Sequence, residues 1–270
     1  MMPSIRVALV FVAALVAAAP GVARAQAERD AFAWSGKIPQ GRWISVVNLN
    51  GTIHVTPTTG DKVEVTGTRR VRRGDPDFVR FEVRKFGASS QDVLICALWG
   101  DNSDCDESGY RSHGDRNNRG NRDNDVSVEF EVKVPSGVKV GVHSVNGEVR
   151  VEDVASEVEA ETVNGSVVVS TAGGPVNAST VNGSVRATMG SFPLDSDLRF
   201  STVNGSVTAE FAGDLNADVE LSTVNGRFST DYPVTLSGRI DPRHLRAPIG
   251  KGGPRISLST VNGNVELRKR

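Results

Sequence analysis

The residues that could carry out chemistry are scattered along this chain and form no recognisable catalytic or metal-binding set. The four histidines are His54, His113, His143 and His244. None of them stands at a metal-ligand spacing from another histidine, a cysteine or an aspartate. Three glutamates alternate along residues 157–161, but the equivalent positions one repeat later are Pro175, Asn177 and Ser179. Because glycosidases need carboxylates gathered around one bond, the sequence predicts no catalytic residues, no metal, no cofactor and no enzyme activity.

Two short segments resemble ligand-binding loops without meeting the requirements of either loop. Residues 115–120 begin like an EF-hand calcium loop, but Arg119 and Val126 occupy loop positions that need acidic ligands. Residues 250–253 resemble a phosphate loop, but the flanking strand and helix are missing and Pro254 follows at once. We therefore interpret both segments as ordinary loops.

A basic stretch lies near the C-terminus. Residues 239–255 contain five arginines or lysines, His244 and a single acid, Asp241. Such a patch could bind an anionic glycan or a lipid headgroup. We prefer to interpret it as a solvated insertion, because it falls in the longest gap between repeats.

The two cysteines of the chain, Cys96 and Cys105, lie nine positions apart. In an oxidising compartment they are expected to form a disulfide that closes a short loop. A metal site is the alternative, but no histidine or third cysteine lies close in the sequence. We therefore predict the disulfide.

The first 25 residues have the layout of a secretory signal peptide. Arg6 provides a basic start, residues 7–19 are apolar but too short to span a bilayer, and residues 23–25 read Ala-Arg-Ala. Cleavage is expected between Ala25 and Gln26. A membrane anchor is the alternative, but Pro20-Gly21 and the small residues that follow favour export with cleavage. No later stretch is apolar enough to cross a membrane. The mature chain is therefore expected to be exported and to be periplasmic, secreted or associated with the cell surface.

The composition of the mature chain limits its partners. Removal of the signal peptide takes away two arginines and no acids, which moves the net charge from −1 to −3. A charge this close to neutral argues against nucleic acid as a partner. Aromatic residues make up 6% of the chain and glycines number 28, which suits narrow, tightly turned β structure.

A repeated Thr-Val-Asn-Gly phrase organises the chain. The chain contains seven Asn-Gly pairs, most of them within this phrase: Asn50-Gly51, Asn146-Gly147, Asn164-Gly165, Asn182-Gly183, Asn204-Gly205, Asn225-Gly226 and Asn262-Gly263. From Asn146 onward the pairs are 18, 18, 22, 21 and 37 residues apart. Self-similarity at this period is typical of a solenoid, in which no single unit buries its own apolar face. We predict that the pairs are structural corners, and no motif identifies the residues that bind a ligand.

Each repeat of about 18–22 residues contains two alternating strands and two tight turns. Asn-Gly suits the hairpin turn of an antiparallel meander or sandwich, and it also suits the corner of a parallel coil. Only a parallel stack, with strands about 4.8 Å apart, places identical residues in ladders and so explains why the repeats are nearly identical. We therefore predict an all-β, parallel β-helix-like solenoid, with the antiparallel meander or sandwich as the alternative.

The sequence divides the mature chain into three parts. Residues 26–100 are expected to form an N-terminal β segment of the solenoid, and residues 126–270 form the repeat solenoid proper. Between them, residues 101–125 are rich in Asp, Asn and Arg, with only Cys105 and Tyr110 apolar. Such a composition cannot offset the entropy of ordering the segment, so we predict a mobile surface loop.

The order of these features resembles a bacterial family. An export signal, Cys-Ala-Leu-Trp at 96–99, the polar loop, Phe-Glu-Val-Lys-Val-Pro-Ser-Gly at 130–137 and serial Thr-Val-Asn-Gly occur in turn. Over residues 40–268 the chain resembles the putative-adhesin family of exported β-strand repeat proteins, a domain of unknown function. The resemblance implies a β-solenoid fold and brings no catalytic residues.

These observations favour a non-catalytic, exported β-repeat protein that acts as an adhesin-like binding or structural module of the cell envelope. Its ligand is expected to be an envelope or surface protein or glycan, held on a flat sheet face or by the 101–125 loop. One alternative is an envelope-stress sensing or interaction protein. A less favoured alternative is a polysaccharide-active β-helix enzyme.

Overall fold

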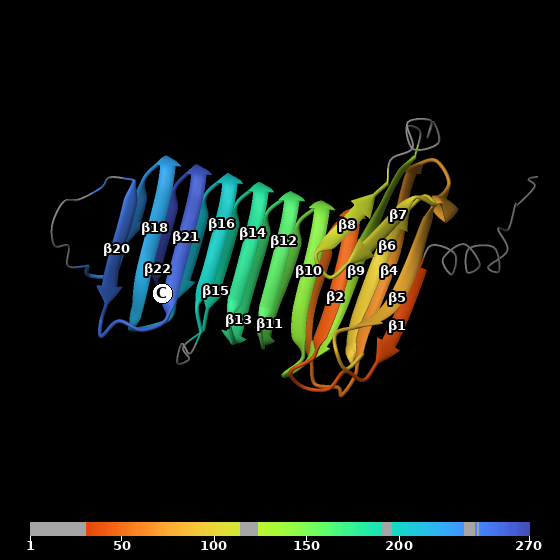
Figure 1. The fold of residues 1–270 in the computed structure, drawn as a ribbon, viewed down its shortest axis with the longest axis horizontal. Helices are drawn as coiled ribbons and strands as arrows, with labels where there is room; N and C mark the ends of the chain where they lie inside the picture. The colour runs from red at the N-terminus through yellow and green to blue at the C-terminus, as the bar shows by residue number, and fades with distance from the viewer. Residues whose placement is uncertain (1–30, 114–123, 191–195, 235–240, 242) are drawn as a thin grey trace, which may run out of the picture.

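The chain forms two long β-sheets that lie face to face along the whole molecule (Figure 1). This computed structural model describes residues 31–113, 124–190, 196–234, 241 and 243–270. Within those residues the only helical element is a 3-10 turn at Pro76–Phe78, and no helix is long and apolar enough to cross a membrane. The expected cleavage residues, Ala25 and Gln26, lie outside the described residues.

The two sheets, here named A and B, each contain ten strands. In spatial order, sheet A consists of β1 (Ala31–Gly36), β4 (Val63–Arg73), β9 (Asp125–Pro135), β3 (Ile53–Thr58), β11 (Val149–Ala155), β13 (Val167–Gly173), β15 (Val185–Met189), β17 (Val207–Phe211), β22 (Val265–Lys269) and β19 (Phe228–Thr230). Sheet B consists of β20 (His244–Ile249), β18 (Ala217–Asn225), β21 (Arg255–Asn262), β16 (Leu198–Asn204), β14 (Val176–Asn182), β12 (Val158–Asn164), β10 (Lys139–Asn146), β2 (Trp43–Asn50), β6 (Asp92–Trp99) and β5 (Val79–Phe86). A separate hairpin consists of β7 (Ser103–Asp106) and β8 (Gly109–Ser112).

One strand of sheet B, an Asn-Gly corner and the following strand of sheet A form one rung of a coil. Successive rungs pair in parallel, and equal repeat positions lie side by side. Asn146 pairs with Asn164, and Asn164 pairs with Asn182. This register confirms the predicted β-solenoid, and the repeats do not form the antiparallel meander.

The core between the sheets is thin because the inward-facing residues are small. In the rung formed by β12 and β13, Val158, Ala160, Val167 and Val169 are all buried. The next rung places Ala178 and Ala187 at the same depth, both fully buried. The strict alternation of the sequence therefore sends one side-chain set into the core and the other to the two outer faces.

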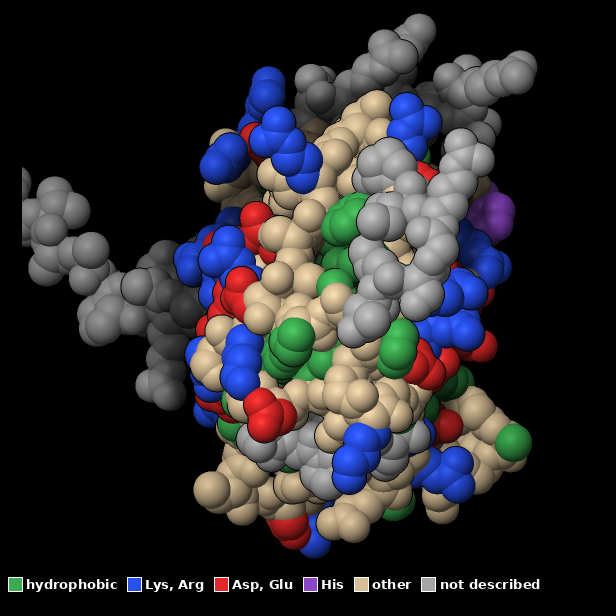
Figure 2. Space-filling model, turned by 90° about the vertical axis from the view of Figure 1, so that its left-hand side faces the viewer, with side chains coloured by type: hydrophobic (Ala, Val, Ile, Leu, Met, Phe, Trp, Pro, Cys, Tyr) green, Lys and Arg blue, Asp and Glu red, His purple; other side chains and the backbone are tan. Residues whose placement is uncertain are grey.

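Antiparallel strands cover most of the open edges at the two ends of the solenoid. At the N-terminal end β5 pairs with β6, and β4 followed by β1 pairs with β9. At the other end β20 pairs with β18, and Figure 2 shows hydrophobic side chains in the middle of this end, surrounded by charged ones. Covered edges limit pairing with other chains. The N-terminal segment 26–100 is thus a solenoid only in part, since β1, β4 and β5 are antiparallel additions.

The last rung along the chain is not the last rung in space. β21 lies between β16 and β18, and β22 lies between β17 and β19. The C-terminal segment, residues 255–269, is therefore threaded between two rungs that precede it in the sequence. The 37 residues from Asn225 to Asn262 include the edge strand β20. Part of the basic stretch around His244 is therefore a strand of sheet B.

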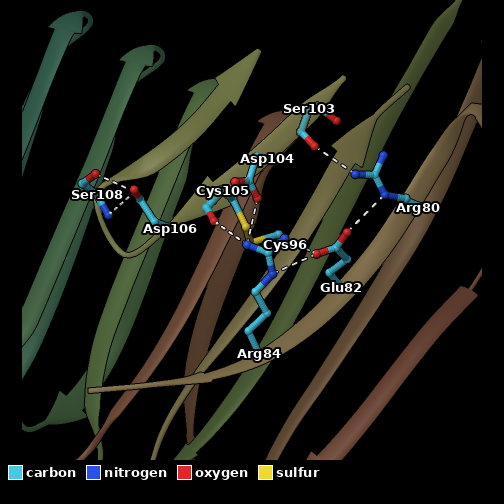
Figure 3. The surroundings of a disulfide bond; sticks show 9 residues. All are labelled: Arg80, Glu82, Arg84, Cys96, Ser103, Asp104, Cys105, Asp106 and Ser108. Carbon is cyan, nitrogen blue, oxygen red and sulfur yellow. Dashed lines mark hydrogen bonds and ion pairs between the residues drawn. A yellow bond between two sulfur atoms is a disulfide. The ribbon is translucent and has the colours of Figure 1, made fainter. Parts of the chain in front are cut away.

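Part of the segment predicted as a mobile loop, residues 101–125, forms an ordered hairpin. β7 and β8 pair with Cys105 opposite Tyr110. Cys105 is joined to Cys96 of β6 by a disulfide, and the Arg84 guanidinium donates a hydrogen bond to the Cys105 carbonyl at 3.0 Å (Figure 3). These contacts come from strands distant in the sequence, so composition could not reveal them, and the loop prediction was wrong for residues 103–112. Residues 114–123 lie outside the described part.

Removing the disulfide is expected to destabilise the protein by roughly 2–3 kcal/mol, the chain-entropy estimate for a loop of this length. Cys96 and Cys105 are both buried, so the double alanine variant removes the bond without exposing a new polar group. The measurement is urea unfolding of the oxidised protein, the reduced protein and the variant. Equal unfolding free energies in all three samples would show that the bond does not stabilise the hairpin.

Candidate functional site

Three of the four residues in each Thr-Val-Asn-Gly phrase hold the corner together. The threonine hydroxyl donates to the corner glycine carbonyl of the neighbouring rung, as from Thr180 to Gly165 at 2.8 Å. The asparagine amide bonds to its counterpart, as from Asn182 Nδ2 to Asn164 Oδ1 at 2.8 Å. The glycine allows close approach, because a Cβ placed on Gly183 would lie 1.9 Å from the Gly165 carbonyl oxygen. These three residue types therefore have structural roles.

The structure brings all seven predicted Asn-Gly pairs together along one edge. In spatial order the ladder is Asn50, Asn146, Asn164, Asn182, Asn204, Asn262 and Asn225. Each of the six contacts is an Nδ2 donor bonded to an Oδ1 acceptor at 2.8 Å. The corner glycines in the same order are Gly51, Gly147, Gly165, Gly183, Gly205, Gly263 and Gly226. The corners thus form a regular edge that borders the outer face of sheet B.

The valine of the phrase has no such role and points away from the core. The valine stripe consists of Val163, Val181, Val203, Val261 and Val224. Their side chains are 39–50% exposed, and they make up five of the seven exposed large hydrophobic side chains in the described part of the chain. A contiguous exposed apolar patch is a common feature of interaction surfaces. The stripe therefore marks the outer face of sheet B as a candidate binding surface.

A groove opens where the β7–β8 hairpin lies over this face. β8 lies against β2 and β10 (Figure 1), and the hairpin groove has a volume of about 400 Å³. Ser108 and Tyr110 form its hairpin wall, while Glu161, Ser179 and Val181 contribute to its floor. The disulfide and the edge-to-face contact of Tyr110 with Trp99 hold this wall in place. The groove therefore combines a phenol, hydroxyls, a carboxylate and the first valines of the stripe.

A histidine and a glutamate in this groove join neighbouring rungs. His143 is buried, and its Nδ1 lies 3.5 Å from Glu161 Oε2. Hydrogen bonding and charge from His143, together with the Ser179 hydroxyl, hold the pKa of the Glu161 carboxyl below its usual value despite partial burial. Glu161 is therefore ionised near neutral pH and can accept hydrogen bonds from a ligand.

A second groove crosses the same strands at their other end. This tryptophan groove of about 330 Å³ runs from Trp43 in β2 to β21. The Trp43 ring lies beside Gly141, whose missing side chain leaves space, and the Lys139 ammonium lies 5.4 Å from the ring centroid. Asn177 and Arg199 pair in register farther along the groove. An aromatic ring followed by planar polar groups suits a ligand that needs both apolar contact and hydrogen bonds.

The other titratable residues from the sequence do not assemble into a reactive site. His54 lies on the outer face of sheet A between Glu131 and Glu152, at 3.1 and 3.2 Å. On edge strand β20, Arg246 pairs with Glu220 at 3.0 Å, so part of the basic stretch is neutralised. The described residues contain no group of three His, Cys, Asp or Glu side chains able to hold a metal.

Sequence reasoning identified the corners but missed both grooves. The valine stripe had a readable signal, since a valine between an inward threonine and the corner must face outward by strand alternation. The two grooves had no such sequence signal, because they depend on where the hairpin packs and on which rungs stack beside Trp43.

The fold and this laddered outer face define a repeat protein of the β-solenoid class. The chain belongs to the Toastrack DUF4097 family, whose sequence model matches residues 117–268.

Comparison with solved structures finds proteins of low sequence identity to this chain. A putative cell adhesion protein from Clostridium sporogenes has 8% sequence identity, with a TM-score of 0.41 over 89% of this chain and 100% of that chain. A putative adhesin from Bacteroides fragilis has 12% identity, with a TM-score of 0.28 over 89% of this chain and 97% of that chain. The search of curated proteins found no match.

Proposed function

We propose that this protein is a non-catalytic binding module of the cell envelope and that it holds its ligand on the outer face of sheet B. The protein would be exported and cleaved between Ala25 and Gln26, as the N-terminal sequence predicts. Family membership and the stacked, rigid architecture support a binding or structural role.

One observation carries the choice of this face. The hairpin groove and the tryptophan groove lie at opposite ends of the same parallel strands, and both include side chains of β12 and β14. The valine stripe begins in the hairpin groove and continues across β16, β21 and β18. A rigid sheet that presents a continuous apolar stripe and two polar grooves is suited to binding an extended ligand.

The ligand that fits best is an extended glycan chain that crosses the strands. The tryptophan groove contains three acidic and two basic residues, namely Glu157, Glu159, Asp197, Arg199 and Arg255. These mixed charges do not favour a strongly anionic or cationic polymer. The Trp43 ring can contact the apolar face of a sugar, while Asn177 and its neighbours can bond hydroxyl groups.

Replacing Trp43 or Tyr110 with alanine is expected to weaken ligand binding by roughly tenfold or more, because aromatic anchors commonly dominate binding energy. The measurement is binding of the intact exported protein to an array of purified glycans, with affinities then determined for the glycans retained. Arg186→Ala on the outer face of sheet A is the control and should bind normally.

Thermal unfolding of each variant separates loss of the site from loss of the fold. Glycan binding that both aromatic variants retain would overturn the assignment of this face. Hydrolysis or elimination of a bound glycan would overturn the non-catalytic proposal. If the protein bound envelope proteins but no glycan, the glycan proposal would be wrong and the ligand would be a protein.

A further inference from the structure

The Asn-Gly corners are chemically labile in principle, and the structure makes one of them different from the rest. In an Asn-Gly pair the glycine backbone nitrogen can attack Cγ of the asparagine side chain. The new N–Cγ bond closes a succinimide ring, and the Cγ–Nδ2 bond breaks so that the amide leaves as ammonia with the glycine proton. Water then opens the ring to aspartate or isoaspartate. The reaction needs a free glycine nitrogen and a flexible corner.

In six of the seven corners the glycine nitrogen, which is the nucleophile of this reaction, is held in a hydrogen bond. Each of these glycine N–H groups donates to the asparagine carbonyl of the next rung, at 2.8–3.0 Å. The bonds run from Gly51 to Asn146, Gly147 to Asn164, Gly165 to Asn182, Gly183 to Asn204, Gly205 to Asn262 and Gly263 to Asn225. In all six corners the glycine is partly covered. Attack therefore requires at least local opening of the stack.

The seventh corner, Asn225-Gly226, lies at the open end of the ladder. Gly226 is the only exposed glycine among the seven corners, and its N–H has no hydrogen-bond partner among the described residues. In the described part of the chain, the hydrogen bonds on the β20 side of β18 end at Thr223, whose N–H donates to the Arg243 carbonyl at 3.0 Å, and none of them reaches Gly226. The nucleophile is thus available without any opening of the solenoid.

We propose that Asn225 is a site of spontaneous deamidation and that stacking protects the other six asparagines. The change would alter the end of the ladder, because Asn225 Nδ2 now donates to Asn262 Oδ1 at 2.8 Å. An aspartate at position 225 would place a carboxylate oxygen against that Oδ1. Loss of this bond and the new negative charge would loosen the terminal corner.

The test is incubation of the folded protein in mildly alkaline buffer, followed by peptide mass spectrometry of the seven pairs. Asn225 is expected to react at least about tenfold faster than Asn164 or Asn182, since an opening free energy of about 1.4 kcal/mol already lowers a reactive population tenfold. In concentrated urea the seven rates should become similar, because the dipeptide is the same. Similar rates in the folded protein would overturn the proposal.

Amide hydrogen exchange provides a second readout that does not depend on the deamidation chemistry. The Gly226 amide is expected to exchange much faster than the Gly183 amide, because only Gly183 is bonded within the stack. Strong protection of Gly226 would show that its nitrogen is covered, and this result would overturn the inference that an unbonded Gly226 nitrogen makes Asn225 reactive.

Discussion

Replacing Gly183 with alanine is expected to destabilise the solenoid by about 3 kcal/mol or more, although the change adds only one methyl group. That methyl carbon would lie 1.9 Å from the backbone oxygen of Gly165 and 2.5 Å from its carbonyl carbon. Both atoms belong to the backbone of the preceding rung, so the clash cannot be relieved by rotation of a side chain. The rungs must separate at this corner, which also disturbs the hydrogen bond from Gly183 N–H to Asn204. Urea unfolding measures the loss.

Gly173→Ala is the matched control within the same repeats. A Cβ at Gly173 meets no atom within 4 Å, so its substitution is expected to change the unfolding free energy by less than about 0.5 kcal/mol. Because each rung touches only its neighbours, hydrogen exchange should show lost protection on both sides of Gly183. Equal unfolding free energies for the two variants would contradict the close approach of the corners.

Deleting residues 255–270 is expected to unfold the C-terminal third of the solenoid, although only the end of the chain is removed. The deleted segment carries four fully buried side chains, Ile256, Leu258, Val265 and Leu267. Burial of four such side chains contributes about 6–12 kcal/mol, which is comparable with the whole unfolding free energy of a domain. The deletion also separates β16 from β18 and β17 from β19. Hydrogen exchange should show lost protection in β18 and β20 as well as in β16.

Two point variants distinguish a threaded rung from a terminal one. Leu258→Ala in β21 is expected to cost about 2–5 kcal/mol and to loosen both β16 and β18. Leu245→Ala in edge strand β20 should cost less and loosen only β18. If the deletion protein instead kept full protection in β18, the preceding rung would have moved into the gap, and the expectation would be wrong.

The sequence predicts the repeating part of this fold because each repeat contains the residues that bond it to its neighbours. The Thr and Asn side chains and the backbone groups of each phrase bond to residues of the same phrase in the neighbouring rungs, so near-identity of the copies indicates stacking. The disulfide was also predictable, because the two cysteines lie only nine positions apart, and the structure joins Cys96 to Cys105.

The features that the sequence could not predict depend on which of several similar segments, distant in the sequence, pack against each other. Nothing in the phrase around Asn262 distinguishes a place beside Asn204 from a place beyond Asn225, since all three corners offer the same groups. The ordered hairpin at 103–112 depends on contacts from Arg84 and Cys96 in other strands. The two grooves depend in turn on that hairpin and on the final stacking order.

The threaded C-terminal segment means that the order of synthesis differs from the order of assembly. A chain made from its N-terminus could add the rungs of β10 through β17 one after another, each onto a finished neighbour. β18 and β19 would emerge next, but β21 and β22, which pair with them in the native structure, are made after them. Until β21 and β22 are made, β18 and β19 must either remain unpaired or pair transiently with β16 and β17 and then separate from them. Residues 255–269 thus control completion of the solenoid, because a chain that terminates before them cannot fill the gap between β16 and β18.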